Sequence, residues 1–129
     1  MVMTVAGQPL RLLHLEDSLA DHVLAKLTLQ RAKLHCNVQQ VDTLQDFCDL
    51  TSNQPFDLIL ADYRLQGFTA LDAWEHVAKL ATPVPFVLLS GAIGEAAAVD
   101  AMRLGFSDYL LKDDISRLPH VVTRAIEVH

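Results

Sequence analysis

The segment from Phe56 to Gly67 constrains the fold of this chain more than any other part of the sequence. It follows Pro55, and its residues Leu58-Ile59-Leu60-Ala61 are continuously apolar. A short apolar run of this kind is typical of a strand buried on both faces, as in a parallel sheet. Because Asp62 follows the run, the sequence predicts a carboxylate at the carboxyl end of a buried strand, where open α/β sheets bind their ligands.

Five such short runs alternate with helical patterns along the chain. The expected strands cover residues 10–15, 35–41, 57–61, 86–89 and 108–111. The expected helices begin after Ser18 and at about residues 43, 69, 94 and 118. This alternation predicts repeated βαβ units, hence a parallel sheet with helices on both faces. We expect a flavodoxin-like, doubly wound α/β fold with five strands in the order 2-1-3-4-5 and five helices.

The first helix has a clear start in the sequence. Ser18 is a typical N-cap residue, and Asp21 places a negative charge in the first turn. The apolar side chains that follow at helical spacing are expected to face the core; they are Ala20, Val23, Leu24 and Leu27.

Length and composition limit the classes of protein to which the chain can belong. With 129 residues, 51% of them hydrophobic, the chain is predicted to form a single domain over residues 1–129. The net charge of −6 disfavours direct nucleic-acid binding and an anionic membrane surface. Cys36 and Cys48 lack metal-ligand spacing, and no apolar run approaches the length of a membrane span, so a cytoplasmic protein without membrane contact is expected.

Polar groups follow four of the predicted strands. The first strand leads into Glu16 and Asp17, the third into Asp62, the fourth into Ser90 and the fifth into Lys112. Each has an ordinary explanation when taken alone, as a helix-start acid, a turn residue or a solvated lysine. Parallel strands bring their carboxyl ends to one edge, so the joint occurrence favours a functional site.

Three carboxylates at one edge repel each other, and a divalent cation would relieve that repulsion. Mg²⁺ prefers oxygen ligands in octahedral geometry, and Mn²⁺ is expected to substitute for it. We predict Asp17 and Asp62 as direct ligands, Glu16 as a ligand through water, and the backbone carbonyl of Arg64 as a further ligand.

The remaining groups suit phosphoryl chemistry. A carboxylate oxygen of Asp62 can attack phosphorus and form an acyl phosphate, which makes Asp62 the predicted phosphoacceptor. Lys112 would neutralise phosphoryl oxygens as a point charge, and Ser90 offers a hydroxyl donor to the same group.

With these residues in place, the chain resembles the receiver domain of two-component response regulators over essentially its whole length. The residues that carry the resemblance are Glu16-Asp17, Asp62, Ser90-Gly91, Tyr109 and Lys112. The resemblance implies Mg²⁺-dependent phosphoryl transfer to Asp62 from a sensor histidine kinase or a histidine phosphotransfer protein. It implies no enzyme activity beyond the domain's own phosphorylation and dephosphorylation.

The resemblance also implies an output. Ser90 and Tyr109 are expected to move together on phosphorylation and to remodel the face formed by the fourth helix, fifth strand and fifth helix. That face would control a partner or an attached output domain, and it is the expected surface of a homodimer. The chain would be a stand-alone regulator or a receiver from a larger protein.

One departure from the family pattern concerns the residues after Lys112. Many receivers have proline next, whereas this chain has Asp113 and Asp114. A cis peptide bond is therefore not expected there. The connection to the last helix is expected to be longer, with Pro119 at the helix start.

Two alternative functions are compatible with a site of this kind. The first is a receiver-like interaction module that works without phosphorylation, in which the acidic pair, the acceptor or the lysine is usually lost. The second is a Mg²⁺-dependent aspartyl phosphohydrolase of the haloacid dehalogenase type, which needs an Asp-x-Asp pair. Arg64 stands two residues after Asp62, which argues against the second alternative.

Overall fold

A single five-stranded parallel sheet forms the centre of the protein in the computed structural model, which describes residues 8–128. The sheet strands are β1 (Leu10–Leu15), β2 (Cys36–Val41), β3 (Leu58–Ala61), β6 (Phe86–Ser90) and β7 (Asp108–Leu111). The helices are α1 (Leu19–Arg31), α2 (Leu44–Asn53), α3 (Ala70–Ala78), α4 (Glu95–Leu104), the 3₁₀ helix η2 (Lys112–Arg117) and α5 (Leu118–Val128). Two further short strands, β4 (Arg64–Leu65) and β5 (Phe68–Thr69), lie outside this sheet.

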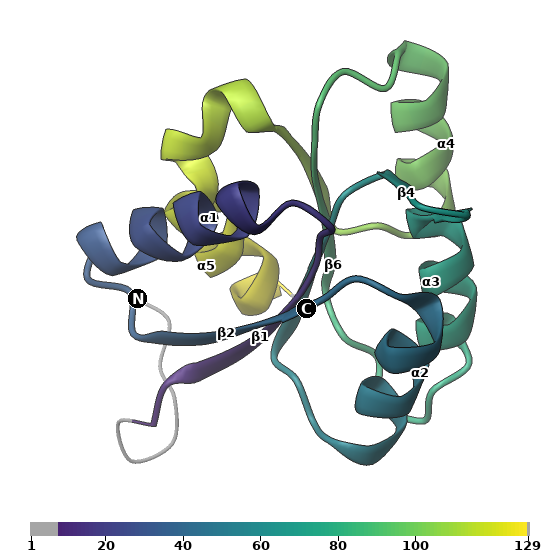
Figure 1. The fold of residues 1–129 in the computed structure, drawn as a ribbon, viewed down its shortest axis with the longest axis horizontal. Coiled ribbons are helices and arrows are strands. Elements are labelled where there is room, and N and C mark those ends of the chain that lie inside the picture. Colours follow the sequence, from purple (N-terminus) through teal and green to yellow (C-terminus); the bar gives the residue numbers. More distant parts are fainter. Residues whose placement is uncertain (1–7, 129) are drawn as a thin grey trace.

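The topology confirms the predicted fold class. The strand order is β2-β1-β3-β6-β7, which is 2-1-3-4-5 when the five sheet strands are numbered along the chain. All of their pairings are parallel, and Leu12 of β1 pairs with Val38 on one side and Leu58 on the other. Figure 1 shows α1 and α5 on one face of the sheet and α2, α3 and α4 on the other. The fold is thus flavodoxin-like and doubly wound.

The core consists of two apolar layers, one on each face of the sheet. Successive strand residues point to opposite faces, so Leu58 and Leu60 pack toward α1 and α5, whereas Ile59 and Ala61 pack toward α2 and α3. All four of these β3 side chains are fully buried. The apolar run of β3 is therefore buried on both faces, as the sequence predicted.

The short antiparallel pair of β4 and β5 was not expected from the sequence. Gly67 occupies the turn with a φ of 83°, a left-handed conformation that glycine adopts without steric cost. Beyond the pair, the Ala70 backbone N–H donates to the Tyr63 carbonyl at 2.9 Å. The segment after Asp62 is thus a closed hairpin rather than an open loop.

The predicted inward face of α1 is wrong. The buried side chains of this helix are His22, Ala25 and Leu29, whereas the predicted Ala20, Val23, Leu24 and Leu27 are exposed, as is Leu19. Apolar residues occur around most of the circumference of α1, so periodicity alone cannot select one face. The tight connection from β1 through the Ser18 cap sets the rotation of the helix, and the small Ala25 lies against the sheet.

Helices α3 and α4 differ in how their ends are formed. Helix α3 ends at Ala78, where Lys79 and Leu80 donate to carbonyls three residues back and tighten the last turn. In α4, Gly94 stands at the N-cap position without a side-chain hydrogen bond, and Ala101 is the buried residue of that helix. Helix α4 is thus lightly anchored to the rest of the domain.

None of the helices within residues 8–128 combines the length and apolar character that a bilayer crossing requires.

The corrected orientation of α1 can be tested by two substitutions of the same type. Leu29 is 1% exposed and Leu24 is 44% exposed. Leu29→Ala should lower the free energy of unfolding by about 2–4 kcal/mol, because it leaves a cavity under the helix. Leu24→Ala should change it by less than about 0.5 kcal/mol. Urea unfolding followed by circular dichroism gives both values, and equal losses would contradict the described packing.

Candidate functional site

Two strands deliver carboxylates to the carboxyl edge of the sheet. The Glu16 backbone N–H donates to the Val41 carbonyl, and the Asp62 N–H donates to the Leu15 carbonyl, both at 2.9 Å. These bonds extend the parallel ladder by one residue beyond β1 and β3. The sheet itself therefore fixes the positions of Glu16 and Asp62 side by side.

Glu16, Asp17 and Asp62 form one acidic cluster. Each residue offers an oxygen, and these oxygens all lie within 4.8 Å of one another. Glu16 is fully buried, Asp62 is half-buried and Asp17 is exposed. Burial raises the pKa of Glu16, although the nearby Lys112 and the Ser18 N–H partly oppose that rise. The cluster thus combines oxygen ligands, close spacing and excess negative charge.

Lys112 lies at the start of η2 and supplies the positive charge. Its Nζ is 2.7 Å from Glu16 Oε1, 2.7 Å from Asp21 Oδ2 and 3.1 Å from Asp62 Oδ2. Burial lowers the pKa of Lys112, but pairing with the three carboxylates outweighs burial and raises that pKa above its ordinary value. The ammonium group is therefore charged at neutral pH and directed toward Asp62.

Ser90 contacts the other oxygen of Asp62. Its hydroxyl donates to Asp62 Oδ1 at 2.5 Å and accepts from the Tyr63 backbone N–H at 3.2 Å. Tyr109 on β7 is half-buried and packs with the core layer beneath α3 and α4. It pairs with Leu88, two residues before Ser90 on β6. The predicted residues at the ends of β1, β3, β6 and β7 thus converge at one edge of the sheet. Tyr109 lies on β7, the strand next to β6.

Two predicted features lie beside this edge. Arg64 is on β4, with its guanidinium 5.8 Å from the centre of the Tyr63 ring. Asp113 and Asp114 are exposed in η2, which connects Lys112 to α5, and Pro119 is the second residue of α5. No peptide bond between residues 8 and 128 is cis, in agreement with the expectation for this connection.

Asp21 was not predicted as a site residue. In the sequence, Asp21 stands out only as an acid in the first turn of α1, but its side chain reaches Lys112, which is 91 residues away in the chain. No local signal in the sequence points to this contact, because it depends on how α1 packs beside η2 in the folded chain.

A pair of histidines lies below the acidic cluster. His14 of β1 is fully buried, and its Nδ1 is 3.0 Å from the Nδ1 of His22 on α1. Burial, with smaller effects from His22 and Lys112, lowers the pKa of His14 from 6.5 to about 3. His14 is therefore neutral, and one ring nitrogen of the pair donates to the other.

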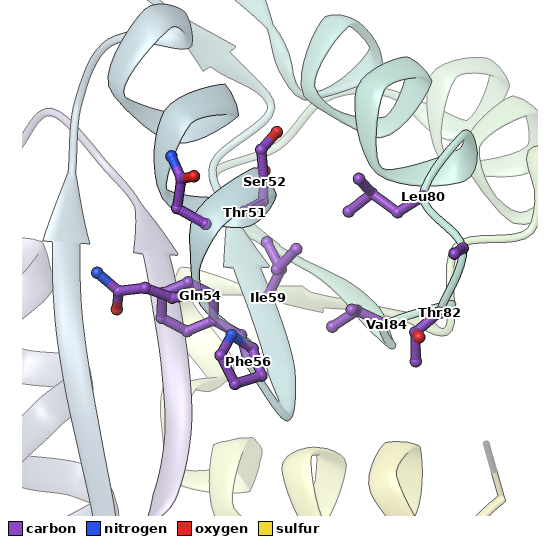
Figure 2. A pocket seen from close by; sticks show the side chains of 11 residues that line it. Thr51, Ser52, Gln54, Phe56, Ile59, Leu80, Thr82 and Val84 are labelled. Carbon is purple, nitrogen blue, oxygen red and sulfur yellow. The ribbon is translucent and has the colours of Figure 1, made fainter.

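The pocket in Figure 2 lies at the opposite edge of the sheet. It has a volume of about 450 Å³ and is lined by the end of α2, by residues that precede β3 and β6, and by Ile59. Phe56, Ile59, Leu80 and Val84 provide its apolar wall, and none of its lining residues in the described part of the chain is ionisable. This pocket lacks groups for proton or phosphoryl transfer, so the carboxyl edge remains the candidate site.

One family model and several known proteins match this chain over most of its length. Residues 13–123 match the family model described as the response regulator receiver domain. The response regulator protein PilR of Pseudomonas aeruginosa is 27% identical over 106 residues, which cover 81% of this chain and 23% of PilR. The regulatory protein LuxO of Vibrio vulnificus is 33% identical over 113 residues, covering 86% of this chain and 24% of LuxO. The chain thus spans about a quarter of these relatives.

Solved structures show the same fold at lower identity. The receiver domain of the sensor histidine kinase PA1611 from Pseudomonas aeruginosa, which has a magnesium ion coordinated in its active-site cleft, superposes with a TM-score of 0.79 at 20% identity. The match covers 92% of this chain and 98% of that one. A response regulator receiver domain protein from Clostridium thermocellum gives a TM-score of 0.80 at 19% identity, covering 92% and 95% of the two chains.

The buried histidine makes a prediction about stability in acid. A folded-state pKa of about 3 against an ordinary value of 6.5 means that the unfolded chain binds a proton at His14 more readily than the folded protein does. Stability from this residue is therefore lost as the pH falls below 6.5, by about 2 kcal/mol at a pH of about 5.

The His14→Leu variant should lack this acid-dependent loss. Urea unfolding at a pH of about 7.5 and of about 5 would show a smaller decrease in the free energy of unfolding for the variant than for the wild type. Equal decreases in the two proteins would mean that His14 is not held neutral by the fold.

Proposed function

The chain belongs to the response regulator receiver domain family, and from that membership we propose that it is a phosphorylatable signalling switch whose phosphoacceptor is Asp62. The phosphoryl donor is a phosphorylated histidine of a sensor kinase or of a histidine phosphotransfer protein. The observation that carries this proposal is the double contact of Asp62, with Ser90 at one carboxylate oxygen and Lys112 at the other.

These contacts suggest how the transfer would proceed. A carboxylate oxygen of Asp62 attacks phosphorus, the bond between phosphorus and the donor imidazole nitrogen breaks, and the imidazole leaves with the electron pair and takes up a proton. Lys112 stands 3.1 Å from Asp62 Oδ2, so its ammonium can neutralise phosphoryl oxygens on that side. The Ser90 hydroxyl can turn from Asp62 Oδ1 to donate to another phosphoryl oxygen.

The acidic cluster fits a hard divalent cation. It supplies three carboxylates within 4.8 Å, which is a donor set that suits Mg²⁺ or Mn²⁺ better than a soft metal. Asp17 and Asp62 would bind directly, Glu16 through water, and Arg64 through its backbone carbonyl. When bound, the cation would neutralise the negative charge that Asp62 and the incoming phosphoryl group bring together.

The output follows from the elements that carry Ser90 and Tyr109. A phosphoryl group at Asp62 would draw the Ser90 hydroxyl, and Tyr109 on the adjacent strand would follow it inward. The face of α4, β7 and α5 would change in consequence and control a partner, an attached output domain or a second copy of the chain. We propose a cytoplasmic regulator without direct nucleic-acid or membrane contact.

The first experiment is intact mass spectrometry after incubation with acetyl phosphate, with and without Mg²⁺. The wild type should gain one phosphoryl group in a Mg²⁺-dependent reaction, and Asp62→Asn should gain none, because it lacks the attacking oxygen. Asp57→Asn is the control, since Asp57 precedes β3 at the opposite end of the same strand.

The result also separates the alternatives. An adduct on the Asp62→Asn variant would overturn the assignment of the acceptor. A wild type that gains no phosphoryl group from acetyl phosphate or from a phosphorylated histidine phosphotransfer protein would favour an interaction module that works without phosphorylation. Continuous release of phosphate from many substrates would instead favour a phosphohydrolase.

A second prediction concerns the role of Ser90. Ser90→Ala should still be phosphorylated, because Asp62 and Lys112 remain, but it should lose the coupling to α4. Amide NMR shifts in α4 and β7 should change on phosphorylation of the wild type and change far less in the variant. Equal shift changes in both proteins would exclude Ser90 as the switch residue.

A further inference from the structure

We propose that Asp21, which is not part of the acidic cluster, is a positioning residue. It would hold the Lys112 ammonium beside the phosphoacceptor Asp62. The inference deepens the proposed function and rests on it. It starts from the three ion pairs of Lys112, of which the pair with Asp21 is as short as the pair with the buried Glu16, at 2.7 Å. The pair with Asp62 is longer, at 3.1 Å.

Asp21 is held in place by the start of α1. Its backbone N–H donates to the Ser18 hydroxyl at 3.2 Å, so the N-cap fixes the first turn from which the side chain extends. Lys112 is the first residue of η2, which lies near the other end of the chain. The ion pair therefore joins two elements that the sheet has already placed side by side.

The three partners of Lys112 differ in what else they can bind. The Lys112 ammonium donates hydrogen bonds to Asp21 and Asp62 and forms an ion pair with Glu16. Glu16 and Asp62 belong to the acidic cluster, whereas Asp21 is not among its members. A cation bound by the cluster would share the charge of Glu16 and Asp62, and the attraction of both for Lys112 would weaken. The Asp21 carboxylate would keep its full charge for the lysine.

Loss of Asp21 would therefore change where the ammonium lies. Of its three carboxylate partners, Lys112 would then keep only Glu16 and Asp62. Its ammonium would move toward the acidic cluster and would compete with the cation for the oxygens of these two residues. The pair is partly exposed, with 41% of the Asp21 side chain accessible, so its effect on the free energy of unfolding should be small. The effect should instead be seen in cation binding and phosphorylation.

The chain offers a matched control in α2. Asp46 occupies the same position in its helix as Asp21 does, with its backbone N–H bonded to the Thr43 hydroxyl at 3.1 Å. Its side chain is exposed and lies in a helix on the other face of the sheet. Asp46→Asn therefore removes a first-turn charge without touching Lys112.

The direct test follows the ¹⁵N-labelled Lys112 ammonium by NMR during a Mg²⁺ titration without any phosphoryl donor. In the wild type and in Asp46→Asn the slowly exchanging ammonium signal should persist at saturating Mg²⁺. In Asp21→Asn it should disappear, and Asp21→Glu should restore it. Persistence of the signal in Asp21→Asn would overturn the inference, and this measurement does not depend on phosphorylation.

The kinetic test measures the initial rate of phosphorylation by acetyl phosphate as a function of Mg²⁺ concentration. Asp21→Asn should raise the half-saturating Mg²⁺ concentration by roughly three- to fivefold, as expected for the loss of a partly exposed ion pair. Asp46→Asn should leave it unchanged, and Asp21→Glu should return it toward the wild-type value.

The outcomes separate this inference from the proposed function. A wild type that is phosphorylated, with an unchanged Mg²⁺ dependence in Asp21→Asn, would overturn the positioning role and leave the switch intact. A wild type that gains no phosphoryl group would overturn the switch, and the NMR titration would then decide by itself whether Asp21 holds the lysine.

Discussion

The charge balance around one ammonium group governs the candidate site. Glu16 is fully buried, and a buried carboxylate is stable in its charged form only when an opposite charge or hydrogen-bond donors compensate it. Lys112 provides that charge, and it simultaneously contacts Asp62 and Asp21. A lysine fits this task because the three hydrogens of its compact ammonium point in different directions, whereas the donors of a guanidinium lie in one plane.

The sheet supplies the geometry on which this balance depends. Glu16 and Asp62 follow β1 and β3, which are neighbours in the sheet although about 45 residues separate them in the chain. Ser90 and Lys112 arrive from β6 and β7, the next two strands in order. The ends of four adjacent strands thus form the site together, and no single segment of the chain could form it alone.

The strand order and the convergence at the carboxyl edge could be predicted, because apolar runs, caps and strand ends are local features of the sequence. The inward face of α1 could not be predicted, since Val23 and Leu24 compete with Ala25 and Leu29 for the core and only the sheet decides between them. The contact of Asp21 with Lys112 depends on the packing of α1 beside η2, which local patterns do not encode. The roles assigned to the site residues remain predictions.

Helix α4 has a consequence for the energetics of signalling. A helix with an uncapped start and one buried alanine can open locally at a free energy far below that of global unfolding, whereas β3 cannot. Amide hydrogens of α4 should therefore exchange with solvent through partial opening, while those of β3 exchange only when the whole domain unfolds. A modest change at Asp62 could then redistribute the conformations of α4 without weakening the sheet that holds the site together.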